Sequence, residues 1–345
     1  MRSLVAPKHC SPAGWEVAEV PVPTNTDPTD IIIRVKAGAV MTGDCQRAKG
    51  SPIVTLRKES FPLKIGCEGS GIVAAVGTEV KNLKVGDAVY GLCFTRPASS
   101  IPDPGFCSDF EEAASLPGYT VTAYQTIKRG LVLAREESLE GKTVFVPGAL
   151  SGGGFSAIQV ALNVFGAKKI ISTVSTPKMG LVEQYLPGMV DQLIDYTTTD
   201  VGSVVPKGSV DFMFNTQWNT MGPGIPLLTP ETGILMSIAS IPPPTLMKEV
   251  LGPSMVPFWV GWLLNLAQLW YLFLLRGTNI KHEFVSGNPE IREDLEKAGE
   301  FIATGKVKGV FRVVDLAELK SVRDECEKVN SGKGGIGRYI VRVES

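Results

Sequence analysis

Residues 144–161 read VFVPGALSGGGFSAIQVA: a short apolar run, a glycine-rich turn and the start of an amphipathic segment. This order predicts a buried strand that leads through a tight turn into a helix. Small residues at such a turn let backbone N–H groups and the helix N-terminus approach a diphosphate closely. Against the dinucleotide-binding pattern GxGxxG the turn offers Ala149, Ser151 and Gly154, so two of the three glycines are replaced. The strand-turn-helix context strengthens this weak match and favours a nucleotide site over a turn without a ligand.

Short apolar runs and helix-like segments alternate after this turn, which predicts βαβ units and a parallel sheet. The apolar runs are KIISTVS (169–175), LIDY (193–196), VDFMFN (210–215) and GILMSIAS (233–240). The first part of the chain is instead rich in β-branched residues bounded by glycine. Its expected strands are IIIRVKAGAV (31–40), GSGIVAAVGTEV (69–80) and KVGDAVYGL (84–92), followed by a loop over 93–108 and a helix capped by Asp109. The sequence therefore predicts an α/β fold with a parallel sheet beside a β-rich part.

About twenty residues beyond the glycine turn, an NAD-binding domain places an acid that binds the ribose 2′-hydroxyl. Residues 172–178 contain no Asp or Glu and offer Ser175, Thr176 and Lys178. Hydroxyls and a cation suit a 2′-phosphate better than a diol, so the sequence favours NADPH over NADH. The alternative for Lys178 is an ordinary solvated surface lysine.

Composition disfavours several other classes of protein. The 345 residues allow two domains with cores of their own, and a net charge of -1 does not favour a nucleic-acid partner. None of the six cysteines forms a CxxC pair, and the chain has two histidines, so disulfide scaffolds, histidine-rich metal sites and Ser-His-Asp catalysis are disfavoured. The first residues lack the apolar run of a signal peptide, and a cytoplasmic location is expected.

Several stretches, in order along the chain, carry a resemblance to a known family. They are VKAGAVMTGD (35–44), IGCEGSGIVAAVGTEVKNLKVGDAVYG (65–91), FEEAASLPGYTVTAYQTI (110–127), the glycine turn, LIDY and GRYIV (337–341). With them the chain resembles the medium-chain dehydrogenase/reductase superfamily, in its zinc-independent quinone oxidoreductase and enoyl reductase branch. The resemblance implies a Rossmann-type parallel-sheet domain and a GroES-like β-rich substrate domain built from both ends of the chain, with the active site in the cleft between them.

The resemblance also implies where the domains begin and end. Residues 1–118 are expected to form the N-terminal part of the GroES-like substrate domain. Residues 119–280 are expected to form the Rossmann NADPH-binding domain, with an apolar helical insertion at about 251–275. Residues 281–345 are expected to complete the sheet and the substrate domain.

In members of this family the turn and the ends of the strands hold the cofactor. The expected NADPH contacts here are Ala149, Leu150, Ser151, Gly152, Gly153, Gly154, Ser175, Lys178, Tyr196, Asn215 and Ala239. Ser151 adds a Cβ where the family's turn brings phosphate oxygens nearest the backbone. Its hydroxyl is therefore expected either to hydrogen-bond the phosphate or to obstruct it.

The zinc-dependent relatives bind metal through a Cys three residues before an Asp, the His of a GHE motif and a later Cys. This chain has Met41 at the first position and Gly66-Cys67-Glu68 in place of GHE, and by the resemblance it lacks the region of the later Cys. No bound metal is expected, because Zn²⁺ needs three or four ligands. Met41 and Cys67 are instead expected to line the substrate pocket. Relatives also have a GGFAEY-like strand that this chain lacks between Gly91 and Phe110.

No invariant catalytic residue carries over from this branch, in which solvent or a hydroxyl often supplies the proton. Asp44, Thr122 and Tyr124 are the candidate catalytic side chains because they lie in motif segments near the expected nicotinamide position. A purely structural, hydrogen-bonded role is an equally good interpretation of each. Arg338 is expected to be an exposed arginine, with a contact to cofactor or substrate as the alternative.

The segment LGPSMVPFWVGWLLNLAQLWYLFLL (251–275) has no charged residue from Met255 to Leu275, a length sufficient to span a bilayer. It lies between two expected strands of one sheet, so both of its ends must return to the same side and a single crossing is disfavoured. The alternatives are a helix packed on the cleft or on a dimer interface, with Trp259 and Trp262 lining the substrate pocket, or a helix on a membrane surface. The expected partners are a small hydrophobic substrate and, through this segment, a membrane surface, with the chain a monomer or a homodimer.

Three hypotheses for the function follow. The first is an NADPH-dependent, zinc-independent reductase of an activated C=C bond or a quinone, and fungal relatives suggest a polyketide-type intermediate as its substrate. The second is a redox-silent descendant that acts as an isomerase or cyclase on a hydrophobic intermediate, motivated by Ser151, the shortened substrate domain and the apolar insertion. The third is a scaffold protein at the surface of a membrane.

Overall fold

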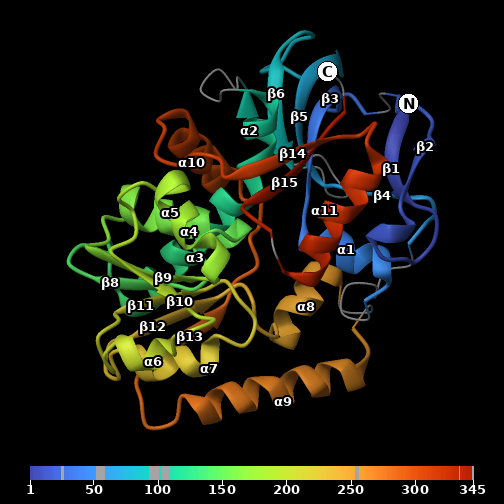
Figure 1. Cartoon of the computed structure of the whole chain (residues 1–345). Helices are drawn as coiled ribbons and strands as arrows, with labels where there is room; N and C mark the ends of the chain where they lie inside the picture. Colours follow the sequence, from blue (N-terminus) through green and yellow to red (C-terminus); the bar gives the residue numbers. More distant parts are fainter. Residues whose placement is uncertain are drawn as a thin grey trace. The chain divides into compact units, whose positions relative to one another are not determined.

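The computed structural model describes residues 1–24, 27–51, 59–92, 101–102, 109–252, 256–333 and 335–343. The chain divides into two compact units, of which one comprises Met1–Gly118 and Pro289–Ser345 and the other Tyr119–Asn288 (Figure 1). Both ends of the chain therefore belong to the same unit, which the chain leaves at Gly118 and re-enters at Pro289.

The middle unit is built on a parallel sheet. Its strands are β8 (Thr143–Val146), β9 (Lys169–Val174), β10 (Gln192–Asp195), β11 (Phe212–Asn215), β12 (Ile234–Ser237) and β13 (Lys281–Phe284). They lie in the order β10-β9-β8-β11-β12-β13, and every neighbouring pair is parallel. This is the strand order of dinucleotide-binding domains, which reverses between the first and fourth strands, here β8 and β11. The expected Rossmann-type parallel sheet is confirmed.

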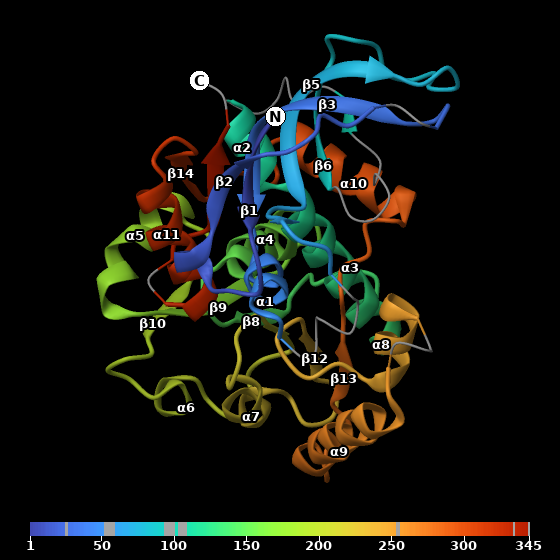
Figure 2. The same ribbon diagram turned by 90° about the vertical axis from the view of Figure 1, so that its right-hand side faces the viewer.

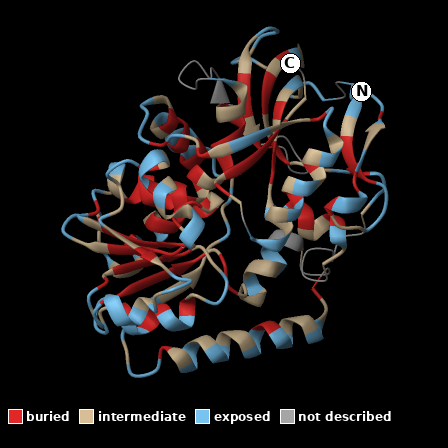
Figure 3. Cartoon of the chain, in the orientation of Figure 1, coloured by how far each residue is buried: buried red, intermediate tan, exposed pale blue. Residues whose placement is uncertain are grey.

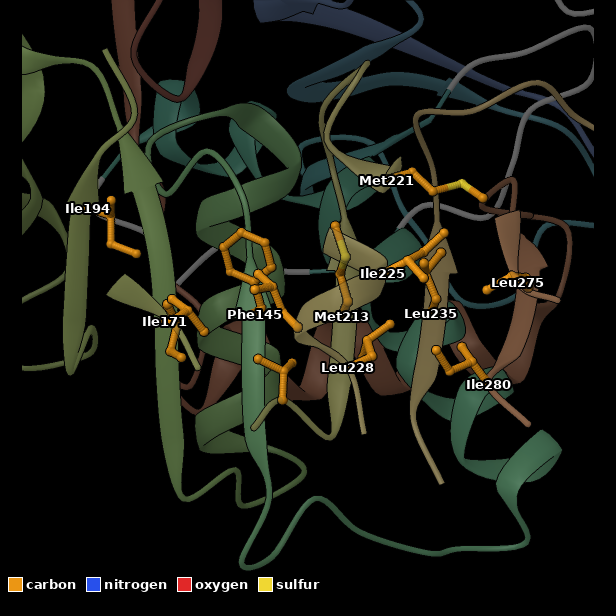
Figure 4. Packing of buried hydrophobic residues seen from close by; sticks show 13 residues of the cluster. Phe145, Ile171, Ile194, Met213, Met221, Ile225, Leu228, Leu235, Leu275 and Ile280 are labelled. Carbon is orange, nitrogen blue, oxygen red and sulfur yellow. The ribbon is translucent and has the colours of Figure 1, made fainter. Parts of the chain in front are cut away.

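Helices cover the parallel sheet, so its central strands are apolar on both faces. The helices are α3 (Pro117–Ala134), α4 (Gly152–Asn163), α5 (Met179–Tyr185), α6 (Val201–Val204), α7 (Met221–Gly224), α8 (Pro244–Leu251) and α9 (Phe258–Leu274), with 3-10 turns at Thr176–Lys178 and Ile225–Leu227. Figure 4 shows one side of the core, where Phe145, Met213 and Leu235 project from β8, β11 and β12 towards Ile225 and Leu228. Leu275, directly after α9, belongs to this core, and Tyr271 and Leu274 of α9 pack against it. Figure 2 shows α9 at the lower edge of this unit.

The other unit is rich in β-strands, as expected. One sheet has the order β14-β15-β3-β5-β6-β7, and a smaller one the order β2-β1-β4. The strands are β1 (Arg2–Ala6), β2 (Glu16–Glu19), β3 (Ile31–Val40), β4 (Leu63–Lys64), β5 (Glu68–Val76), β6 (Ala88–Leu92), β7 (Ile101–Pro102), β14 (Phe311–Asp315) and β15 (Arg338–Arg342). Because β15 pairs antiparallel with β3, the two ends of the chain share one sheet.

Helices α1 (Thr42–Lys49) and α11 (Leu319–Ser331) cover a core beside these strands, around Trp15, Cys45 and Cys326. The unit also contains α2 (Phe110–Ser115), α10 (Arg292–Ala303) and a 3-10 turn at Pro12–Gly14. The sequence analysis did not predict α1, α11 or β14.

Two local expectations concern the boundaries of helices. Asp109 caps α2 as predicted, because its carboxylate accepts a hydrogen bond from the backbone N–H of Glu112 at 2.7 Å. The helix expected after the glycine turn, α4, begins at Gly152 within the turn, where Ser151 is its N-cap. The expected loop over 93–108 contains the short strand β7. Its remaining residues, and with them most of the stretch expected to lack a family strand, lie outside the described residues.

Candidate cofactor site

The glycine turn follows β8 and is tied to the neighbouring strand β9. The backbone N–H of Gly148 donates to the hydroxyl of Thr173 at 3.0 Å, and the N–H of Ala149 donates to the carbonyl of Thr173 at the same distance. Gly148 has a φ of +79°, a backbone conformation that favours glycine. The turn therefore has a defined shape before any ligand binds.

Ser151 is the N-cap of α4. Its hydroxyl oxygen accepts a hydrogen bond from the backbone N–H of Gly154 at 3.0 Å. Serine is among the residues most favoured at this position, because its side chain satisfies one of the N–H groups that a helix leaves without a carbonyl partner. The sequence analysis treated this hydroxyl only as a phosphate ligand or an obstacle and missed its structural role.

Three backbone N–H groups of the turn point to anion binding. Within the described part of the chain, the N–H groups of Leu150, Gly152 and Gly153 have no protein acceptor. They lie at the positive end of α4, where the helix dipole favours a negative charge. Three amides around one helix N-terminus fit the oxygens of a diphosphate, so the turn is able to hold a dinucleotide.

Packing also requires the glycines. A Cβ on Gly154 would lie 2.0 Å from the carbonyl oxygen of Gly148, and a Cβ on Gly152 would lie 2.6 Å from the ring of Tyr119. The first of these is a contact between backbones that cannot relax easily, which is the reason for a glycine at the last position of the nucleotide pattern. Tyr119 thus borders the turn, a position that the sequence analysis missed.

The carboxyl ends of β9 and β10 form the region expected to meet the adenosine ribose. Ser175 and Lys178 follow β9, and Tyr196 follows β10 with its side chain 58% exposed. Asp195, which the sequence analysis did not consider, lies between them. Its carboxylate accepts hydrogen bonds from the hydroxyls of Thr176 and Thr197, both at 2.6 Å, and these bonds lower its pKa. An acid is therefore present beside the expected 2′ position, although it belongs to the next strand.

The carboxyl ends of β11 and β12 carry the next group of expected cofactor residues. Asn215 is buried, and its amide donates to the hydroxyl of Ser237 at 3.0 Å and to the carbonyl of Ala239 at 3.3 Å, while its oxygen accepts from Thr220. These bonds engage the Asn215 side chain within the protein, where it holds β11 to the segment after β12. Ala239 thereby has a fixed place at the carboxyl end of β12.

Thr216 and Gln217 were not predicted, yet they border the glycine turn. The hydroxyl of Thr216 donates to the carbonyl of Pro147, and the Gln217 amide would lie 2.8 Å from a Cβ on Gly148. Their signal was available in the sequence, since both follow β11, the strand expected next to β8 at the reversal of strand order.

Helix α3 carries two of the predicted catalytic residues, which lie in different surroundings. Thr122 faces the segment after β13, where a Cβ on Gly287 would lie 2.1 Å from its hydroxyl oxygen. The ring of Tyr124 stacks on Phe165, with centroids 5.8 Å apart, just beyond the C-terminal end of α4. Tyr124 is therefore at the opposite end of α4 from the glycine turn, and the two residues do not share a site.

The third predicted catalytic residue, Asp44, lies in the β-rich unit and holds two segments together. Its carboxylate accepts from the backbone N–H of Met41 at 2.9 Å and from that of Gly66 at 3.3 Å. Burial raises the pKa of Asp44, while both backbone bonds act in the opposite direction. Met41 and Cys67 lie at adjacent ends of the antiparallel strands β3 and β5, so the structure brings these two predicted pocket residues together.

Glu68 and Arg338 form a buried ion pair next to this group. Their side chains are fully buried, and the guanidinium of Arg338 donates to the Glu68 carboxylate. Burial raises the pKa of Glu68 to about 7, although Arg338 acts to lower it. The expectation of an exposed Arg338 was wrong, because β15 pairs with β3 and turns this side chain into the unit.

The described residues contain no group of three or more His, Cys, Asp or Glu side chains able to hold a metal ion. Asp44 is engaged with backbone amides, and Met41 offers only an uncharged thioether.

Trp259 and Trp262, expected in the substrate pocket, lie on α9 with side chains 55% and 63% exposed. Neither belongs to the buried core of its unit. Among the described residues, no helix combines the length and the apolar character needed to cross a membrane.

Known proteins resemble the chain in both parts. Residues 27–131 match the alcohol dehydrogenase GroES-like domain. The chloroplastic NADPH-dependent alkenal/one oxidoreductase of Arabidopsis thaliana is 31% identical over 53% of this chain and 49% of its own length. The 2-methylene-furan-3-one reductase of Solanum lycopersicum is 30% identical over 56% of this chain and 50% of its own length. The chain thus spans about half the length of the curated relatives it matches.

The likeness in fold extends over the whole chain. The structure of the quinone oxidoreductase from Coxiella burnetii superposes with a TM-score of 0.76 at 20% identity, covering 100% of this chain and 99% of that one. At this level of identity the likeness shows the shared fold alone.

Proposed function

We infer the activity of this chain from its resemblance to the medium-chain dehydrogenase/reductase superfamily. We propose that it is an NADPH-dependent, zinc-independent reductase of an activated C=C bond or of a quinone. The observation that carries this proposal is the set of backbone N–H groups of Leu150, Gly152 and Gly153 at the start of α4, whose geometry suits a diphosphate. The names of the relatives, an alkenal/one oxidoreductase and a furanone reductase, support the reduction of an alkene next to a carbonyl group.

When bound, a reduced nicotinamide supplies hydride to the β-carbon of an enone or to a quinone. The residues of this chain bind and orient. The turn amides hold the diphosphate, Ser151 keeps the first turn of α4 closed, and Asn215 fixes the segment after β12. Reduction of an enone also needs a hydrogen-bond donor for the developing enolate oxygen and a source of a proton. We propose Thr122, whose hydroxyl faces Gly287, as the side-chain donor, with solvent as the source of the proton.

We propose NADPH as the preferred nucleotide. Ser175, Lys178 and Tyr196 follow β9 and β10, the strands whose ends meet the adenosine ribose in this fold. A hydroxyl, an ammonium group and a phenol are all able to donate hydrogen bonds to a 2′-phosphate. A highly reducing polyketide synthase of Didymella fabae is 35% identical over 45% of this chain and 8% of its own length, which supports an enoyl group of a polyketide-type intermediate as the natural substrate that we propose.

Nucleotide titration tests this proposal first. Isothermal titration calorimetry with NADPH and NADH is expected to show saturable binding of both, with NADPH the tighter. Loss of the reduced nicotinamide absorbance would then be followed with an alkenal, a cyclic enone and a quinone as acceptors. No saturable binding of either nucleotide would overturn the reductase assignment. Conversion of a substrate without consumption of NADPH would favour the isomerase or cyclase alternative.

A further inference from the structure

Helix α9 is packed on its own unit along one face only. Leu264 is buried, and Leu275 at the end of the helix belongs to the core beneath the parallel sheet. Gln268 donates to the carbonyl of Ile241 at 3.0 Å, and the hydroxyl of Tyr271 accepts from the N–H of Ile241 at 2.9 Å. These positions recur at helical spacing and therefore define a single inner face.

The outer face of α9 is apolar and exposed (Figure 3). Its large apolar side chains are between 43% and 90% exposed, and they are Phe258, Trp259, Trp262, Leu263, Leu266, Leu269, Trp270, Leu272 and Phe273. At 3.6 residues per turn they cover about half of the helix circumference. Asn265 is the one polar residue at the exposed positions of α9, and the helix carries no charge. An exposed apolar patch made of nine neighbouring large side chains is typical of a binding surface.

We propose that the outer face of α9 binds the surface of a lipid bilayer that contains anionic lipid, with the helix lying in the plane of the interface. The breadth of the apolar arc is the first argument. A helix of a second copy that packs on α9 would meet it along one narrow ridge and leave the rest of the arc in water. A fluid apolar phase surrounds a convex ridge completely and so covers the whole arc.

The distribution of charge is the second argument. Residues 250–282 contain no Asp or Glu and include Arg276 and Lys281, while Lys248 and Glu249 lie directly before this range and Glu283 lies directly after it. The Arg276 guanidinium lies 4.3 Å from the centre of the Phe273 ring, so a cation stands directly beside the exposed apolar face. Cations at the ends of an apolar helix complement anionic lipid headgroups, and tryptophan is enriched at the same depth of a bilayer.

Vesicle flotation tests the proposal. The full-length protein is mixed with vesicles of phosphatidylcholine, alone or with about one-third phosphatidylserine. It is expected to float with the anionic vesicles, and more weakly as salt is raised. The triple variant W262Q/L266Q/L269Q removes the centre of the outer face and is expected to bind at least about tenfold more weakly. The matched control V132Q/V204Q/V313Q changes three exposed valines outside α9 and is expected to bind like the wild type.

A second measurement on the wild type does not depend on any variant. Three of the five tryptophans lie on α9, at 259, 262 and 270, so vesicles with brominated acyl chains are expected to quench a large part of the tryptophan fluorescence. Absence of both flotation and quenching overturns the proposal. It is equally overturned if the wild type is a dimer that W262Q/L266Q/L269Q converts to monomer while vesicles have no effect, since a second copy then covers the face.

Discussion

Replacing Ser151 separates its two roles, as a helix cap and as a neighbour of the cofactor. Ser151→Ala removes the 3.0 Å hydrogen bond to the Gly154 N–H. The loss of a serine N-cap to alanine costs about 1 kcal/mol, within a range of about 0.5–2 kcal/mol, whereas glycine at this position costs only a few tenths. For a unit of this size the alanine variant should therefore unfold about 2–4 °C below the wild type. Ser151→Thr keeps a hydroxyl at the cap and serves as the matched control.

Nucleotide binding is expected to respond differently. In Ser151→Ala and Ser151→Gly the Gly154 N–H loses its acceptor and joins the N–H groups of Leu150, Gly152 and Gly153 as a further donor to the diphosphate. The dissociation constant of NADPH should therefore stay the same or decrease, even though the free protein is less stable. Urea unfolding measures the stability, and calorimetric titration measures the affinity. If Ser151→Ala binds NADPH tenfold or more weakly at unchanged stability, the hydroxyl contacts the phosphate and is not a cap.

Three further perturbations test other parts of the structure. Gly154→Ala places a Cβ against a backbone carbonyl and should destabilise the protein by about 1–3 kcal/mol or more in urea unfolding, with loss of nucleotide binding. The control Gly222→Ala places its Cβ in open space and should change the free energy of unfolding by less than about 1 kcal/mol. Asp195→Asn removes a negative charge beside the expected 2′-phosphate, so the ratio of NADPH to NADH affinity should rise in paired titrations, and an unchanged ratio would mean that this carboxylate is remote from the phosphate. Burial lowers the pKa of His282 to about 4, so the imidazole stays neutral in the folded protein at a pH where it is protonated in the unfolded chain. The contribution of neutral His282 to the free energy of unfolding is present above about pH 6.5 and is lost as the pH falls towards 4. The free energy of unfolding then changes by at most about 1.4 kcal/mol per pH unit. The variant His282→Phe lacks this titrating group, so the difference in unfolding free energy between wild type and variant should change with pH between about 6.5 and 4. An identical pH dependence of the two proteins would contradict the assignment.

The local pattern of the chain was sufficient for the parallel-sheet unit. Apolar runs separated by helical segments predict a parallel sheet, because each strand must be followed by a crossover that covers it. The glycine turn could be placed at the start of α4 for the same reason. The hydrogen bonds of individual side chains could not be predicted in this way. The Ser151 hydroxyl accepts a hydrogen bond from the Gly154 N–H of α4, and the spacing of apolar residues does not indicate this bond.

The predicted site residues illustrate the difference. Asp44 and Asn215 were expected at the site on the basis of family motifs, and in the structure each satisfies buried backbone or side-chain groups. Tyr119 and Gln217 border the turn, although neither was among the predicted site residues. Asp195 lies beside Thr176 because β10 runs parallel to β9, a contact that joins residues about twenty positions apart.

The sequence by itself therefore determined the alternation of strands and helices in the parallel-sheet unit, the position of the glycine turn and the apolar character of residues 251–275. These properties depend on residues that are close together in the chain, so the spacing of apolar and small side chains is sufficient to predict them. Only the tertiary structure decided which polar groups are already satisfied, that Arg338 is buried against Glu68, and which half of α9 remains exposed. Those outcomes depend on contacts between segments that are far apart in the chain, because the burial and the hydrogen-bond partners of a residue are determined by the segments that pack against it.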